Sequence, residues 1–155
     1  MKLSEFKNTK PKLLLEEYFL GNCKAWGVFE SRRGKIKNQF SVDIKGTWDG
    51  QKLIINEDFI FANGHVDNRL WTITKIGKYG YQGTAEGVVG KAVGEVSGQA
   101  FRWNYKFKLQ VGARKFIVNF DDWMFLQDEK ILINRAVLRK FGFVVGRVWL
   151  FFERS

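Results

Sequence analysis

The chain has 155 residues, enough for one domain with a sizeable core. Its formal net charge of +10, from 26 Lys and Arg against 16 Asp and Glu, favours anionic partners such as nucleic acid, a phospholipid surface or an acidic small molecule. One Cys excludes an internal disulfide framework, and one Cys with one His cannot build a zinc site of the usual ligands. We therefore expect neither a metal nor a cofactor.

Residues 1–22 differ in pattern from the rest of the chain. Pro11 is suited to open a helix, and the run KLLLEEYFL is typical of one or two amphipathic helical turns that end at Gly21-Asn22. We expect this segment to plug one end of a sheet or to cover it as a lid. The apolar run is too short for a secretory signal and contains two glutamates. The sequence has no 18-residue apolar run, so we expect no membrane-spanning helix.

Residues 23–155 predict a β-barrel. Turn signals recur about every ten to twelve residues, with strand-like runs between them, and short turns join strands into an antiparallel meander. Eight to ten such strands would leave two exposed edges unless the sheet closes. The prediction is an all-β fold, a single antiparallel up-and-down barrel of 8–10 strands with a short N-terminal helical segment. A two-sheet sandwich is the alternative.

One segment breaks the regular strand pattern. Residues 83–98 (GTAEGVVGKAVGEVSG) carry a Gly every three to four residues. Each Gly costs about 1 kcal/mol in a helix relative to Ala. We therefore expect a strongly curved or bulged strand rather than a helix.

The longest alternating pattern lies in residues 99–127. Aromatic and aliphatic side chains predicted to share one face are Phe101, Trp103, Tyr105, Phe107 and Leu109. The intervening residues, Arg102, Asn104, Lys106, Lys108 and Gln110, fall on the other face. A nucleic-acid platform needs aromatics and cations on one face. The alternation therefore argues against nucleic acid as a partner.

A few polar residues interrupt the apolar faces of the predicted strands. By phase, Glu57 and Asp122 share the side of the aromatics of their strands, and Arg69 and Arg135 are available as partners. Buried charges must be paired or hydrogen-bonded. Two interpretations follow: a polar cluster at the base of an aromatic cavity, which holds a ligand head group, or a salt-bridge network that fixes the register of the barrel. Burial also raises carboxyl pKa values, so acid–base catalysis is a further candidate, although no nucleophile pattern accompanies it.

Several short motifs together resemble one family. They are AWGVF, FSVDIKGTWDG, LIINEDFIF, RLWTI, YQGTA, FRWNY, FDDWM, INRA and KFG, spread from about Tyr18 to Arg154. The chain resembles the DUF3833 family of small bacterial proteins, many of them described as lipoproteins. The resemblance implies a lipocalin-like or calycin-like barrel and an association with membrane-lipid modification, such as fatty-acid remodelling. Matching positions are Trp26, Trp48, Glu57, Arg69, Trp71, Trp103, Tyr105, Asp121, Asp122, Trp123, Asn134 and Arg135.

The sequence departs from the lipoprotein members because Cys23 follows no signal segment. We therefore expect the cytoplasm, or the cytoplasmic face of the inner membrane, with peripheral contact to anionic lipid. The predicted function is binding of a fatty acyl chain or another elongated hydrophobic molecule inside the barrel. The alternatives are a lipid-modifying enzyme that uses Glu57 or Asp122 as acid or base, and an interaction module with a filled core. The predicted ligand-binding residues are Arg69, Trp71, Trp103, Tyr105, Phe107, Phe120, Asp122, Trp123, Met124, Asn134 and Arg135.

Overall fold

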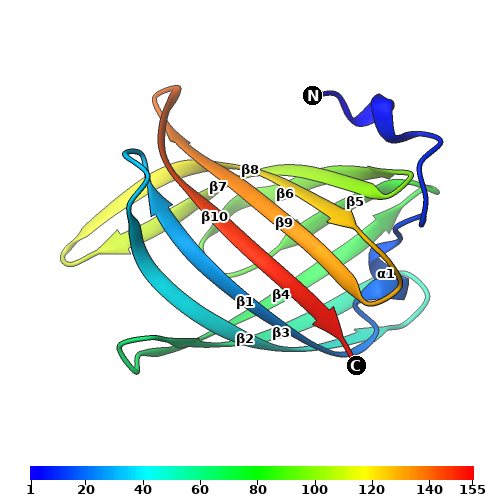
Figure 1. Ribbon diagram of the computed structural model, residues 1–155, viewed down its shortest axis with the longest axis horizontal. Coiled ribbons are helices and arrows are strands. Elements are labelled where there is room, and N and C mark those ends of the chain that lie inside the picture. The colour runs from blue at the N-terminus through cyan, green and yellow to red at the C-terminus, as the bar shows by residue number, and fades with distance from the viewer.

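Ten antiparallel strands close on themselves into one barrel (Figure 1). The computed structural model describes the backbone of residues 1–155 and the side chains of residues 1–110 and 112–155. The strands are β1 (Gly21–Ser31), β2 (Ile36–Trp48), β3 (Lys52–Phe61), β4 (Val66–Ile76), β5 (Gly80–Thr84), β6 (Val88–Ser97), β7 (Ala100–Val111), β8 (Arg114–Leu126), β9 (Ile131–Lys140) and β10 (Phe143–Arg154). Among the described residues, no helix combines the length and hydropathy needed to cross a bilayer.

The first and last strands close the barrel. β1 pairs with β10 from Cys23 opposite Arg154 to Ser31 opposite Gly146, and every other strand pairs with its sequence neighbours. Each strand therefore has two partners, although the short β5 pairs only with residues 72–76 of β4, and residues 66–71 pair with β3 alone. The predicted up-and-down barrel is confirmed, and the two-sheet sandwich is excluded.

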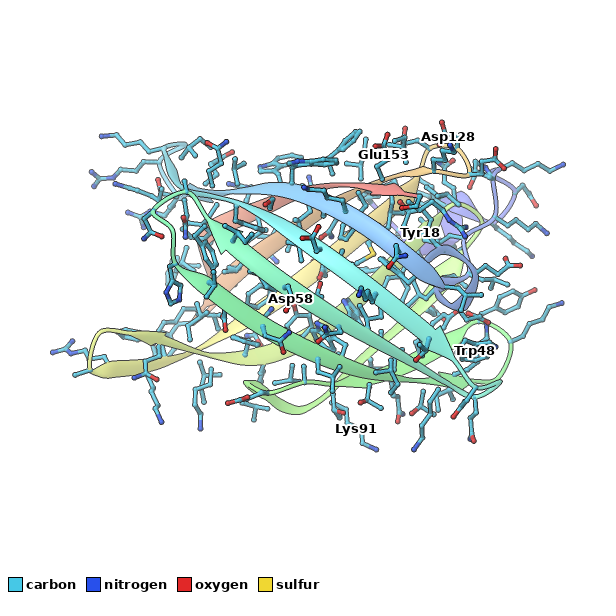
Figure 2. The ribbon with its side chains drawn as sticks, turned by 90° about the horizontal axis from the view of Figure 1, so that it is seen from below. Tyr18, Trp48, Asp58, Lys91, Asp128 and Glu153 are labelled. Atoms are coloured by element: carbon cyan, nitrogen blue, oxygen red, sulfur yellow. The ribbon has the colours of Figure 1, made fainter. Side chains whose placement is uncertain are left out.

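The hairpin turns divide between two ends of the barrel (Figure 1). Turns 32–35, 62–65, 112–113 and 141–142 lie at the end that we call the open end. The turn 85–87 points the same way but stops short of this end, because β5 ends opposite Thr72 of β4. The opposite end, which we call the closed end, carries the short helix α1 (Leu15–Tyr18). Figure 2 shows Tyr18, Asp128 and Glu153 together at the closed end.

The closed end is filled by residues 13–19. Leu13, Leu15, Tyr18 and Phe19 are each less than 5% exposed. The Tyr18 hydroxyl donates a 2.6 Å hydrogen bond to the carbonyl of Lys130. These contacts anchor the segment across the end of the barrel.

A second set of polar contacts anchors the same segment from the side of β4 and β5. Lys75 forms a 2.5 Å ion pair with Glu16. The Tyr81 hydroxyl donates to Glu16 and accepts a 3.3 Å hydrogen bond from the backbone N–H of Leu15. The segment is therefore fixed to the barrel wall by charge as well as by apolar packing.

The N-terminal 3-10 turn η1 (Leu3–Phe6) lies outside the barrel rather than at its end. Phe6 contacts Trp123, with ring centroids 6.1 Å apart, and Phe125, at 5.5 Å. Both rings belong to the outer face of β8. This contact shields the rings on the outer face of β8 from solvent.

The glycine-rich segment 83–98 contains a bulge, as the sequence indicates. It also contains a turn, which the sequence does not indicate. The pairing of β6 with β7 shifts between Val89 and Val93. Residues 85–87 reverse the chain between β5 and β6. The predicted single curved strand is therefore a short hairpin with an irregular second strand.

Candidate functional site in the barrel interior

The barrel interior is packed in one half and accessible in the other. In the half next to the closed end, Leu53, Ile73, Phe101 and Leu132 are each 3% exposed or less. Toward the open end, inward-facing side chains are only half-buried. They are Phe29, Phe40, Phe59, Phe61, Leu109, Phe116 and Phe120. Solvent therefore reaches the interior from the open end.

A polar cluster lies between the two halves, and we call it the polar floor. Its five members each come from a different strand: Glu57 (β3), Arg69 (β4), Tyr105 (β7), Asp122 (β8) and Asn134 (β9). Glu57 on β3 stands opposite Arg69 on β4. Side chains opposite one another on an antiparallel pair share a face, so both project inward.

Asp122 is held in place by two donors. The Trp103 indole Nε1 donates to its Oδ2 at 3.3 Å, and the Asn134 amide donates to its Oδ1. The same amide nitrogen donates to the carbonyl of Trp123 at 2.8 Å. Asp122 and Asn134 are 7% and 2% exposed. A carboxylate here replaces a hydrophobic residue in the pattern of β8, and its hydrogen bonds offset part of the cost of burial.

Aromatic rings surround the polar floor. Trp71 and Trp103 lie with ring centroids 4.8 Å apart, and Tyr105 stacks on Phe120 at 4.9 Å. Gly83 on β5 leaves room for the Trp103 ring because it has no side chain. A Cβ atom on Gly83 would lie only 2.7 Å from the Trp103 ring, so no larger residue is accommodated there without movement.

Arg69 lies among rings rather than in open solvent. Its guanidinium carbon is 4.6 Å from the centroid of Phe107 and 5.5 Å from that of Phe59. Both are within the range of a cation–π contact. The aromatic faces therefore hold the guanidinium in the accessible half of the interior, where it can meet an anion.

The two interior carboxyls hold protons more tightly than usual. Burial raises the pKa of Glu57 to about 7, although the charge of Arg69 and the Trp71 side chain oppose the rise. Burial also raises the pKa of Asp122 to about 6, against the hydrogen bonds from Asn134 and Trp103. Burial and the nearby charge of Asp122 raise the pKa of Tyr105 well above its ordinary value. Near neutral pH the polar floor therefore combines a fixed cation with carboxyls that exchange protons.

The structure brings most of the predicted ligand-binding residues together. Those that face the interior are Arg69, Trp71, Trp103, Tyr105, Phe107, Phe120, Asp122, Met124 and Asn134, with Glu57 beside them. Met124 lies on the packed side, 9% exposed. Four further phenylalanines that were not predicted as site residues also face the interior: Phe29, Phe40, Phe59 and Phe61. Phe59 and Phe61 share the phase of Glu57, so strict alternation would have found these two.

Two predicted site residues lie elsewhere and require correction. Trp123 and Arg135 stand opposite each other on β8 and β9, one position out of phase with Asp122 and Asn134. Trp123 is 3% exposed because Phe6 and the guanidinium of Arg102, 5.0 Å from its ring, cover it from outside. Neither residue can contact a molecule inside the barrel.

The outer face has its own charged cluster beside Trp123. Arg102 forms a bidentate ion pair with Asp121, with both N–O distances at 2.9 Å, and Arg139 lies 3.6 Å from the same carboxylate. Asp121 is thus a partner of outer arginines, whereas its neighbour Asp122 faces inward. Among the described side chains, no group of three or more His, Cys, Asp or Glu residues is placed to hold a metal ion.

The fold and the site define a lipocalin-like closed β-barrel with an interior accessible from one end. Within that class, the chain belongs to the DUF3833 family of proteins of unknown function, whose family model matches residues 1–154. The resemblance read from the sequence motifs is confirmed. No curated protein matches the sequence significantly.

A solved structure supports the same fold. The chain is similar to the S-type phycobiliprotein lyase CPES from Guillardia theta, with a TM-score of 0.66 and 9% sequence identity. The match covers 92% of this chain and 93% of that one. At this identity the likeness concerns the fold.

Proposed function

We propose that the accessible half of the barrel binds an elongated amphiphile, a fatty acid or a fatty-acyl lipid, with its anionic head at Arg69 and its apolar body along the phenylalanine rings. The observation that carries the proposal is a guanidinium held between Phe59 and Phe107 in the half-buried part of an aromatic interior. Ligand sites are mostly apolar concavities with a few placed polar groups, and this interior has that composition.

The neighbouring carboxyls set a condition on such a ligand. An ionised Glu57 or Asp122 would repel a carboxylate at Arg69, whereas the protonated forms would not. Since the pKa of Glu57 is about 7 and that of Asp122 about 6, binding of an anionic head takes up a proton near neutral pH. We therefore expect affinity for a fatty acid to increase as pH falls from 8 to 6, and to change less in Glu57→Gln.

The test is a fluorescence titration with 12-(9-anthroyloxy)stearate and, in parallel, with its uncharged methyl ester. Arg69→Met keeps an unbranched side chain between the rings but removes the charge. A hydrogen bond to a charged group contributes about 1.5–3 kcal/mol, so Arg69→Met should weaken binding of the acid roughly 10- to 100-fold and leave the ester nearly unchanged.

Arg135→Met is the matched control, because Arg135 lies on the outer wall. It should bind both probes as the wild type does. The proposal fails if the wild type binds neither probe, or if Arg69→Met and Arg135→Met weaken binding of the acid equally.

A second candidate is an enzyme that acts on a lipid in the same site, with Glu57 or Asp122 as acid or base. The observation that favours it is that both carboxyls, in a partly accessible site, have pKa values near neutrality, as catalytic carboxyls often do. Wild-type protein incubated with a phospholipid and analysed by mass spectrometry should then yield a modified lipid. Glu57→Gln or Asp122→Asn should still bind the stearate probe but produce none. Unmodified lipid with the wild type would leave only the binding function.

We also propose that the protein acts in the cytoplasm or on the cytoplasmic face of the inner membrane, in contact with anionic lipid. The support is the charge of the chain, 26 basic against 16 acidic residues.

A further inference from the structure

Positive charge is concentrated at the open end. The four hairpins that reach this end are formed by residues 30–39, 60–68, 106–116 and 138–147, whereas the β5–β6 hairpin stops short of it. They contain eleven of the 26 Lys and Arg residues but only two of the 16 Asp and Glu residues, so nine of the ten formal net charges lie there. In the rest of the barrel and in the N-terminal segment, basic and acidic residues nearly cancel.

The same hairpins expose large apolar side chains. Phe141, in the turn between β9 and β10, is 87% exposed, and Phe143 beside it is 71% exposed. Ile36 and Val66, which begin β2 and β4 just after two other turns of this end, are also exposed. Leu20 and Tyr79 are exposed at the closed end, but no comparable excess of positive charge accompanies them.

These two features together fit one kind of surface. Basic residues attract an anionic bilayer and contribute about 1 kcal/mol each near its surface, or about fivefold in affinity. Exposed phenylalanine side chains insert at the boundary between head groups and acyl chains. Nucleic acid would use the charge but would leave the aliphatic and phenylalanine side chains in water. The combination therefore favours lipid.

We infer that the open end docks on an anionic phospholipid membrane, so that the mouth of the interior faces the bilayer. Only the role of this docking rests on the proposed function. In that role, an acyl chain passes between the membrane and the barrel without crossing water. The docking itself depends on the hairpins alone. Figure 1 shows all four hairpins at one end of the barrel, opposite α1 and the C-terminus.

Co-sedimentation with phosphatidylcholine vesicles that contain about 30% anionic phosphatidylglycerol tests the docking. The wild type should bind these vesicles, bind less in high salt, and bind pure phosphatidylcholine at least 25-fold more weakly, about the effect of losing two basic contacts. Arg33→Glu with Lys115→Glu should weaken binding by at least 25-fold, at about fivefold for each lost contact. Lys52→Glu with Lys130→Glu makes the same charge change at the closed end and is the control. Phe141→Ser with Phe143→Ser should weaken binding about tenfold, from lost apolar burial.

Orientation is measured with a fluorescent label. Cys23 is buried, so an NBD maleimide reacts selectively with a cysteine introduced at an exposed site. On Ala113→Cys, in the turn between β7 and β8, NBD fluorescence should increase and shift to the blue when anionic vesicles are added. On Gln51→Cys, at the closed end, it should not change.

Each outcome is decisive for one claim. Equal loss from the open-end and closed-end charge reversals, or a blue shift at Gln51→Cys alone, overturns the orientation. Tight binding to a duplex oligonucleotide without binding to vesicles overturns lipid as the partner. The stearate titration separates the two proposals, because it uses a dispersed probe without a membrane. Vesicle docking with no probe binding would contradict only the proposed ligand site. Probe binding without docking would contradict this inference and the proposed contact with anionic lipid, but not the ligand site.

Discussion

The raised pKa of Glu57 predicts an unusual dependence of stability on pH. Unfolded, this carboxyl has a pKa near 4.5, and folded it has a pKa of about 7. Between these values the folded state binds the proton more tightly than the unfolded state does. The stabilising contribution of protonated Glu57 is therefore complete below pH 4.5 and is lost as the pH rises through 7.

The magnitude follows from the shift. One pKa unit corresponds to about 1.4 kcal/mol, so the full shift corresponds to about 3 kcal/mol. Glu57 is half-buried and water reaches it from the open end, which lowers the effective value. Glu57→Gln replaces the carboxyl with a neutral group of the same shape. We expect this variant to be about 1–3 kcal/mol more stable than the wild type at pH 8 and equal to it at pH 4.5.

The assay is urea unfolding followed by far-UV circular dichroism at both pH values. Asp58→Asn is the matched control, because Asp58 is the next residue on β3 and is exposed on the outer face (Figure 2). Its difference from the wild type should be the same at the two pH values. A Glu57→Gln variant that is less stable than the wild type at pH 8, or shifted equally at both pH values, would refute the assignment of Glu57 to a desolvated interior.

Three further predictions concern packing and the closed end. Gly83→Ala places a Cβ 2.7 Å from the Trp103 ring and should lower the free energy of unfolding by about 1–3 kcal/mol in urea titrations, so an unchanged midpoint would mean that the ring is free to move. Tyr81→Phe removes the hydroxyl that bonds Glu16 and should cost about 1–3 kcal/mol, with no loss expected only if the N-terminal segment does not need this anchor. Burial raises the pKa of the Cys23 thiol to about 11, so Ellman's reagent at pH 8 should modify it far more slowly in the native protein than in urea, and equal rates would contradict its burial.

The fold could be predicted from the sequence because strand alternation and turn spacing are local signals. The alternation of β7 separates Phe101 and Trp103 from Arg102 and Asn104, and the structure has the same division. The turn at 85–87 was missed because glycine suits a bulge and a turn equally, and only the partner strand distinguishes them.

The site was predicted less completely, for two different reasons. Trp123 was included through the family motifs, against the phase of its strand. Arg135 was included as a charge partner for the buried carboxyls, but it lies opposite Trp123 and faces outward. The polar contacts of Glu16 with Lys75 and Tyr81 join residues that are far apart in the chain. No local pattern indicates such a contact, since it arises only when the N-terminal segment folds across the closed end.

The most direct test of the central claim is an NMR measurement of where an acyl chain lies. Intermolecular NOEs between ¹³C-labelled palmitate and the protein should connect the chain to ring protons of Phe59, Phe107 and Phe120, with the carboxyl end nearest Arg69. NOEs confined to outer-face rings such as Trp26 and Trp149, or none at saturating palmitate, would contradict a ligand site inside this barrel.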